Sequence, residues 1–342
     1  MSKQSIDLLN NIRLNASSDY QARVPEATQE SFITVGVALQ TYELQANEFI
    51  GILYGKIGRT ILEQKSFKNK LGRFKSGSVV SPHDVEEIFI EMAKAEGAYD
   101  PEGKNPLGRR PAPDVKVAYH RENRKYYFAK SIGDIDFIKV FRSESTFDAF
   151  VKGIIESIYI GDEYDEWLSM KNLLATFKNS EGTECGYYDY EVLDMAKHTS
   201  KEEFAKAFVK AVRKGVQDVG FMSDKYNIAG VTTKSDPKDL VLLVHKDVLV
   251  EVDVERLATA FHQSDTDVKV VPTIIVMDDF GSLTDTYALM VDEGWFKVWD
   301  TKVHMEPQRN AQGLFTNYFY HHHQIMSASP FKTALRFKRV DA

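Results

Sequence analysis

The sequence holds a single cysteine, Cys185, among its 342 residues. One thiol cannot form a disulfide within the chain, which suits a protein that folds in a reducing compartment. Long apolar runs are also missing, because Leu240–Val244 and Val270–Met277 are the densest and are far too short to cross a bilayer. The first residues, MSKQSIDLLNNIRLNASSD, lack the continuous apolar core of a secretory signal. We therefore expect no membrane partner.

An excess of positive charge is absent as well. The chain carries 43 Lys and Arg against 50 Asp and Glu, a net charge of −7 at pH 7. Proteins whose main task is gripping nucleic acid usually have a basic excess, because phosphate neutralisation supplies most of the affinity. Only weak contact with DNA is expected. The length and the 43% hydrophobic content allow a large core, in one big domain or two average ones.

Catalytic motifs are equally scarce. Between Gly51 and Ile57 the sequence GILYGKI has too few residues between its glycines for a phosphate loop, and it places isoleucine where Ser or Thr should bind magnesium. Asp278 and Asp279 follow an apolar run, as the metal carboxylates of some hydrolases do, but aspartates more commonly start a turn. Cys185 has acidic neighbours in the sequence, which do not favour a reactive thiolate. We expect no cofactor, no metal and no catalysis.

The triplet His321, His322 and His323 invites a metal interpretation. Neighbouring residues of a strand point to opposite faces, so at most His321 and His323 could share an ion. Their alternation with Phe319 and Ile325 favours one half-buried face of a strand.

Hydrophobic periodicity predicts a mixture of helices and strands. Helices are expected at 81–92, where Ser-Pro opens the segment, at 147–174 as one long apolar stripe, at 200–212 with a capping box, and at 254–261. Strands are expected at 115–119 and 126–128 as a hairpin around Arg121–Arg124, and at 240–245, 268–277, 287–291 and 295–299. The last two are joined by residues 292–294, with Gly294 placed for a positive φ. Without regular βαβ alternation, the predicted class is α+β with one long helix.

Charge is segregated along the chain. Residues 59–75 and a later proline-rich loop are basic, whereas 156–194 is strongly acidic. The two stretches are either solvated faces or complementary surfaces on different copies of the chain, with one copy's basic loop on a neighbour's acidic helix. The candidate contact residues are Arg59, Lys68, Lys70, Arg73, Lys75, Arg109, Arg110, Asp162, Glu163, Asp165 and Glu166.

Several blocks, in order, resemble the major capsid proteins of short-tailed phages of the phi-29 type. They are KNKLGRFKSGSVVSPHDVEEIF, PDVKVAYHRENRKYYF, FVKGIIESIYIGDEYDEW, LVEVDVERLATAFH and DEGWFKVWDTKVHMEPQRNAQGLFTNYFYHH. The last block belongs to an aromatic C-terminal stretch, 295–337, that favours strands and holds no recognisable nucleophile or paired metal ligands.

The resemblance implies the Hong Kong 97-type capsid fold over 1–342 as a single unit. Its parts would be an N-terminal arm (1–48), an extended loop (59–131), a peripheral domain with the spine helix (132–181 and 291–342) and an axial domain (182–290). No C-terminal immunoglobulin-like domain is expected.

The resemblance also implies a function. The chain would be a structural protein, not an enzyme, that self-assembles into the hexamers and pentamers of a phage head enclosing double-stranded DNA. Its expected partners are copies of itself, a portal protein, and scaffolding protein and head fibres. The expected location is the virion, after assembly in the host cytoplasm. The alternatives are an encapsulin-like compartment shell protein and a metal-dependent hydrolase using Asp278 and Asp279.

Overall fold

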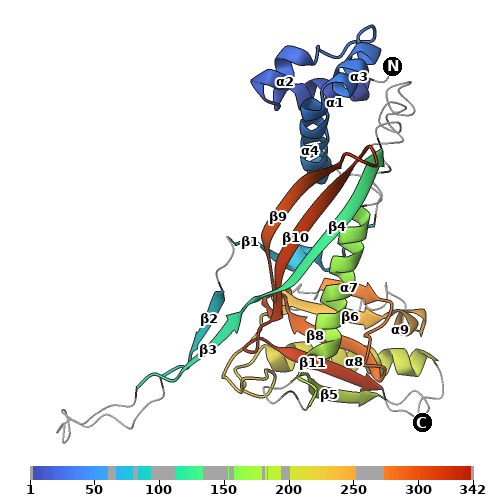
Figure 1. The fold of residues 1–342 in the computed structure, drawn as a ribbon. Helices are drawn as coiled ribbons and strands as arrows, with labels where there is room; N and C mark the ends of the chain where they lie inside the picture. The colour runs from blue at the N-terminus through green and yellow to red at the C-terminus, as the bar shows by residue number, and fades with distance from the viewer. Residues whose placement is uncertain are drawn as a thin grey trace, which may run out of the picture.

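A computed structural model describes residues 3–60, 67–79, 84–93, 112–133, 153, 158–178, 182, 184–193, 201–251 and 273–339. The subunit is elongated (Figure 1): helices lie at one end, a four-stranded sheet with a long helix follows, and a five-stranded sheet lies at the other end. A two-stranded hairpin projects to one side. This combination confirms the predicted α+β class.

Four helices open the chain, and together they form a unit with its own core. Ile12, Phe49 and Leu53 are completely buried in this core, which also takes in Tyr318 and Tyr320 from a much later strand. The described part of the predicted N-terminal arm, residues 3–48, is thus largely helical, and it packs on the tip of the four-stranded sheet. The helices are α1 (Lys3–Leu14), α2 (Ser18–Arg23), α3 (Phe32–Thr41) and α4 (Glu43–Thr60).

The four-stranded sheet has the order β1-β9-β10-β4 and is built on a long antiparallel hairpin. Along β10, Tyr318, Tyr320 and His322 are buried, while the residues between them are partly exposed, as the period of a strand requires. The buried face is turned toward α7 (Ile160–Thr176). The strands are β1 (Lys75–Ser78), β4 (Glu122–Gly133), β9 (Phe296–Asn310) and β10 (Phe315–Ala328).

The five-stranded sheet has the order β5-β11-β8-β6-β7. Strand β6, between β8 and β7, is apolar from Leu240 to Val244 because both faces are covered: Leu242 and Val244 belong to the core under α8, and Val241 and Leu243 to the core on the other side. The elements are β5 (Tyr188–Leu193), β6 (Leu240–His245), β7 (Thr273–Met277), β8 (Thr286–Asp292), β11 (Ala334–Arg339), α8 (Lys201–Val219), α9 (Lys246–Glu251) and the short helix η5 (Pro237–Asp239).

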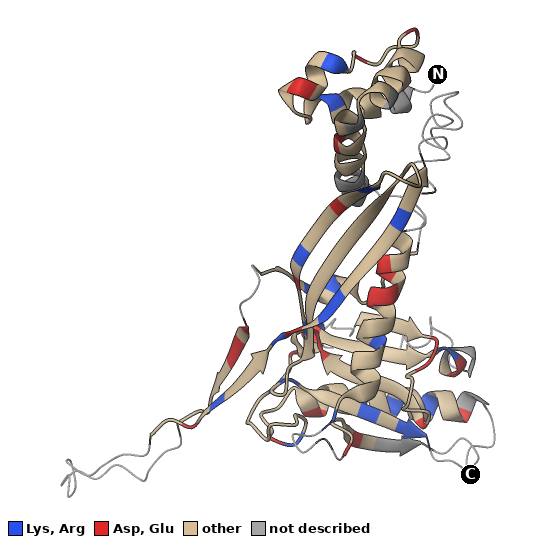
Figure 2. Cartoon of the chain, in the orientation of Figure 1, with Lys and Arg blue, Asp and Glu red and all other residues tan. Residues whose placement is uncertain are grey.

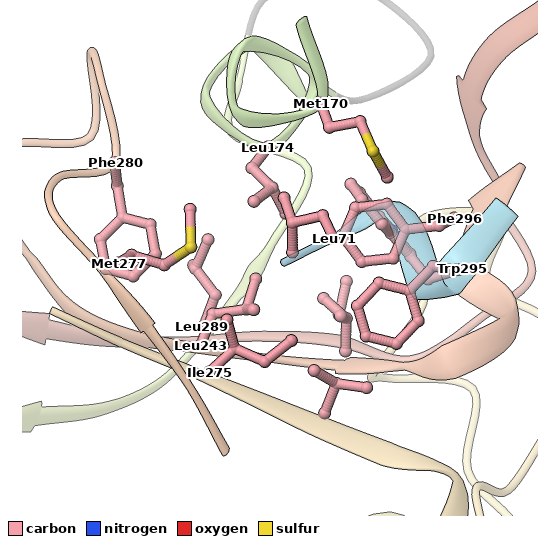
Figure 3. Close-up of a cluster of buried hydrophobic side chains, with 14 of the residues drawn as sticks. Leu71, Met170, Leu174, Leu243, Ile275, Met277, Phe280, Leu289, Trp295 and Phe296 are labelled. Carbon is pink, nitrogen blue, oxygen red and sulfur yellow. The ribbon is translucent and has the colours of Figure 1, made fainter. Parts of the chain in front are cut away.

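The core on the side of the five-stranded sheet away from α8 joins this sheet to α7. Figure 3 shows Leu174 of α7, Leu243 of β6 and Trp295 gathered in it. Phe74 and Phe296 stack with ring centroids 4.8 Å apart and nearly parallel planes. Two short helices supply some of these residues, η2 (Gly72–Phe74) and η6 (Glu293–Trp295). Segments far apart in sequence are thereby fixed against one helix.

Several predicted elements are confirmed. The strand at 240–245 is found with those bounds, and α8 covers the helix predicted at 200–212 and buries its predicted apolar face. Strands also occupy the C-terminal part of 268–277 and both 287–291 and 295–299. The helix predicted at 254–261 and residues 147–152 and 154–157 of the long helix lie outside the described residues.

The helix predicted at 81–92 is wrong. Residues Val85–Ile90 form strand β2, which pairs in antiparallel fashion with β3 (Val115–His120). The apolar residues of VEEIFI satisfy helical spacing and strand alternation alike, and the pairing with β3 decides between them.

Two predicted hairpins are wrong as well. Strands β3 and β4 separate at Arg121, because β3 pairs with β2 while β4 pairs with β10. Residues 292–294 connect β8 to β9, which belong to different sheets, through η6. Gly294 is not among the glycines with positive φ; its N–H donates to Asp292 Oδ1 instead, at 2.9 Å.

The C-terminal residues are divided between the two sheets. Strand β11 lies between β5 and β8 in the five-stranded sheet, whereas β9 and β10 lie in the four-stranded sheet. The aromatic C-terminal stretch therefore contributes to both sheets.

Candidate functional site

The acidic turn at the start of α7 lies beside the four-stranded sheet, where Figure 2 shows its acidic residues. Asp162 and Glu166, one helical turn apart, are 6% and 3% exposed. Two carboxylates buried this deeply need cationic partners, because an unpaired buried charge costs several kcal/mol. The structure supplies these partners from the same chain.

Lys75, the first residue of β1, reaches into this turn. Its Nζ lies 2.9 Å from Glu166 Oε2 and 3.0 Å from Asp300 Oδ1 of β9. Burial alone would lower the pKa of Lys75, but the charges of the two carboxylates raise it above its usual value. The same segment is also held by Asn69, whose side-chain amide donates to Glu166 Oε1 at 2.9 Å.

Arg124 of β4 enters the cluster from the other side. Its Nη2 lies 3.0 Å from Asp162 Oδ1 and 2.8 Å from Asp165 Oδ2, and its Nη1 donates to Gln324 Oε1 at 2.6 Å. The Arg124 side chain is only 3% exposed, so this guanidinium is as deeply buried as the carboxylates that it neutralises.

His322 lies between two carboxylates. Its Nδ1 is 2.6 Å from Asp162 Oδ2 and its Nε2 is 3.0 Å from Asp300 Oδ1. Only the doubly protonated ring can donate at both nitrogens. Burial alone would lower the pKa of His322, but the hydrogen bonds and charges of Asp162 and Asp300 raise it to about 9.

The sequence did not single out His322, because the metal hypothesis concerned its two neighbours. The signal was nonetheless there: His322 shares the inward period of β10 with Tyr318 and Tyr320. His321 and His323 lie on the other face, with ring centroids 6.2 Å apart, so the half-buried strand face is confirmed.

Glu166, Asp300 and His322 offer ligand atoms within 4.8 Å of one another, a spacing that a metal ion could use. However, Lys75 and the Gln324 amide already donate to both carboxylates, with Gln324 Nε2 at 2.6 Å from Glu166 and 2.7 Å from Asp300. The ammonium group of Lys75 thus supplies the cation that these carboxylates require.

The remaining predicted contact residues have different surroundings. Lys68, Lys70 and Arg73 are exposed, and Arg73 makes a loose surface pair, 3.8 Å from Glu293. Glu163 is partly buried and accepts the backbone N–H of Asn69 at 3.0 Å. Arg59 lies near the end of α4, and Arg109 and Arg110 lie outside the described residues.

Three of the predicted contact residues, Lys75, Asp162 and Glu166, have partners within the same subunit, and the two carboxylates are buried. Contact with a neighbouring copy remains a prediction, and among the described basic residues it concerns the exposed Lys68, Lys70 and Arg73.

The projecting hairpin has an exposed surface that is mainly apolar rather than charged. One face of the β2–β3 pair is exposed and mostly apolar, although it belongs to a sheet of only two strands. The five apolar residues of this exposed hairpin face are Ile88, Ile90, Val115, Val117 and Tyr119, each between 41% and 62% exposed.

The opposite face of the hairpin is fixed to the body. Phe89 stacks on Phe331 with ring centroids 5.6 Å apart, and His120 contacts Ser327 and Glu87 at 2.8 and 3.1 Å. Burial alone would raise the pKa of Glu87, but hydrogen bonds from His120 and Lys297 lower it to about 2. The exposed face is therefore held in a defined position and not left to move freely.

The residues considered for hydrolysis have structural partners. Asp278 and Asp279 both pair with Lys171 of α7, at 2.8 and 2.6 Å. Asp279 also accepts the backbone N–H of Gly281 at 2.7 Å, which confirms the turn. These contacts join α7 to the loop after β7 and assign the aspartates a structural role.

The fold defines the class of protein. It resembles a solved capsid structure of Staphylococcus phage Andhra with a TM-score of 0.63, at 12% identity, covering 82% of this chain and 87% of that one. A chain of the mature capsid of bacteriophage PhiM1 matches with a TM-score of 0.52, at 8% identity, covering 82% and 90%. The subunit thus has the Hong Kong 97-type fold of phage capsid proteins.

The sequence narrows this class to one family. The family model of the Phi29-like phage major capsid protein matches residues 9–338. The major capsid proteins of Bacillus phages B103 and PZA are 33% and 32% identical over 341 residues, which cover 99% of this chain and 74% of each relative. That of Streptococcus phage Cp-1 is 27% identical, covering 96% and 92%. The chain belongs to the Phi29-like major capsid protein family.

It is therefore a structural protein of the phage head, and its place is the capsid of the virion. Neither the compartment shell nor the hydrolase is favoured by these relatives. Among the helices that the structure describes, none is long and apolar enough to cross a membrane.

Proposed function

We propose that copies of this subunit assemble into the hexamers and pentamers of a closed head around double-stranded DNA, and that the exposed hairpin face is one of the surfaces that a neighbouring copy covers. The observation that carries this proposal is the apolar face itself. A two-stranded sheet is marginally stable alone, and a contiguous apolar surface in a soluble protein generally marks an interface.

A second set of contacts is electrostatic. Lys68, Lys70 and Arg73 are exposed near the start of α7, and Arg59, Arg109 and Arg110 extend the same basic set along the sequence. We assign these residues to contacts with acidic surface of a neighbouring copy. Charge pairs of this kind steer subunits together and fix their register more than they add affinity.

The further partners follow from the capsid role. The portal protein would occupy one vertex, scaffolding protein and head fibres would bind during or after assembly, and assembly would take place in the host cytoplasm. The net charge of −7 suits a container that holds its DNA weakly and later releases it. The subunit would perform no catalysis.

The test replaces apolar side chains on the exposed hairpin face with polar ones. Ile88 and Val117 are direct cross-strand partners, and both are already exposed, so Ile88→Ser with Val117→Ser should leave the subunit folded. We expect the double variant to remain a soluble unassembled subunit by sedimentation, with a circular dichroism spectrum like that of the wild type.

Ile88→Val with Val117→Ile is the matched control, because it keeps the face apolar and should assemble normally. Normal shells from the serine variant would show that a neighbour does not use this face.

A further inference from the structure

Seven side chains of the buried cluster form a closed ring of hydrogen bonds and ion pairs. In order around the ring, the atoms in contact are separated by 2.6 to 3.0 Å. The members are Lys75, Glu166, Gln324, Arg124, Asp162, His322 and Asp300, with Asp300 returning to Lys75.

Each contact that closes this ring joins a donor to an acceptor, and Arg124 Nη1 also lies 3.3 Å from His322 Nδ1. Lys75 donates to Glu166 and Asp300, and Arg124 donates to Asp162 and to the amide oxygen of Gln324. The Gln324 amide nitrogen donates in turn to Glu166. The circuit then closes only if His322 donates from both of its nitrogens, which requires the imidazolium form.

The charges of the ring members also balance in that form, and Asp165, which pairs with Arg124 from outside the ring, is 38% exposed. Three cations, Lys75, Arg124 and protonated His322, face the three carboxylates of Asp162, Glu166 and Asp300. Loss of the His322 proton would leave a net negative charge in a buried site and point one imidazole lone pair at a carboxylate. Both changes are unfavourable in a region of low dielectric constant.

The ring joins the elements that carry the hairpin. Lys75 comes just before the chain leaves for the hairpin, at Gly77 with φ +104°, and Arg124 comes just after it returns. Both residues bind the same turn of α7, at positions 162 and 166. The entry and exit points of the hairpin are therefore fixed to α7 through one network.

We propose that this ring is a proton-operated joint: protonated His322 holds it closed, with both roots of the hairpin fixed to α7, and loss of that proton opens it. The proposal concerns the single subunit and does not depend on which surfaces the assembled head uses.

Other charged groups lie around His322, and the nearest cation is the Arg124 guanidinium, whose Nη1 is 3.3 Å from His322 Nδ1. Asp165 of α7 binds Arg124, Glu163 lies one residue after Asp162, and the Tyr320 hydroxyl is next to Asp162. On the outer face of β10, Lys302, His321 and Lys125 surround His323 and lie across the sheet from the ring. The carboxylates in contact with His322 thus outweigh the cations near it.

Hydrogen–deuterium exchange on the purified full-length chain tests the joint. After correction for intrinsic rates, we expect the amides of α7 and β1 to be protected at about pH 7 and to lose about tenfold or more of that protection by about pH 10. His322→Gln, which cannot carry the charge, should show the lower protection at both values. His321→Gln, a change on the opposite face of the same strand, should follow the wild type.

The proposal is overturned if His322→Gln keeps the protection and pH profile of the wild type. A second measurement does not require the variant to fold: the carbon-13 shifts of the nine histidines in the wild-type chain. One imidazole should stay protonated well above neutral pH, and nine ordinary titrations would refute the joint.

Discussion

Lys75 and Arg124 show at the residue scale how burial changes the role of a charge. Each pairs with one deeply buried carboxylate, Glu166 for Lys75 and Asp162 for Arg124, so removing the cation leaves a buried charge uncompensated. Such a loss is far more costly than the loss of a surface pair, which is generally worth less than about 1 kcal/mol. Residues with similar charge in the same basic stretch therefore differ sharply in their contribution to stability.

Lys75→Met should destabilise the subunit by about 3 kcal/mol, because Glu166 and Asp300 would lose their ammonium partner while Glu166 stays buried. Lys70→Met, five residues earlier and exposed, should change the free energy of unfolding by less than about 0.5 kcal/mol. Urea unfolding of both variants measures the difference. Equal stabilities would mean that water reaches the cluster and that the ring contributes little.

The sequence could predict which residues carry charge, but not where those charges meet. Glu166 lies 91 residues from Lys75 and 158 from Gln324, and nothing local to any of them indicates the others. His322 shows the same limit, since its inward direction follows from the strand period whereas its carboxylate partners come from α7 and β9.

At the scale of elements, the patterns that succeeded were those that only one structure satisfies. LVLLVH is short, apolar throughout and rich in branched residues, and α8 has its apolar residues on one face over 19 residues. The segment 85–90 failed because its apolar spacing fits a helix and a strand equally. The strand that decides between them is β3, which lies about thirty residues later in the chain. The residues of 85–90 do not themselves indicate this partner.

Strands β9 and β10 belong to the four-stranded sheet, and β11 belongs to the five-stranded sheet. Neither sheet can therefore form completely without the C-terminal residues. A chain ending before Trp295 would lose the central hairpin of one sheet and an internal strand of the other. We expect this truncated chain to be insoluble or unfolded, not merely unable to assemble. Circular dichroism and limited proteolysis would show this, and a soluble fragment with α8 resistant to protease would contradict it.

At the scale of the whole molecule, the subunit is long and carries a hairpin, β2–β3, with an apolar face that the rest of the subunit does not cover. The hairpin projects from the body (Figure 1), with one face fixed and one apolar face exposed, and Lys68, Lys70 and Arg73 are exposed as well. An isolated subunit leaves this apolar face in contact with water, whereas in a shell of identical copies the next subunit can bury it. The family assignment and the shape of the subunit lead to the same conclusion by independent routes.

Electron cryomicroscopy of shells assembled from the purified protein tests this account most directly. The account predicts closed shells in which a neighbouring subunit covers Ile88, Val117 and Tyr119, and in which Lys68, Lys70 and Arg73 lie within ion-pair distance of a neighbour's carboxylates. Closed shells that leave the hairpin face open to solvent, with no acidic group near these three cations, would contradict it.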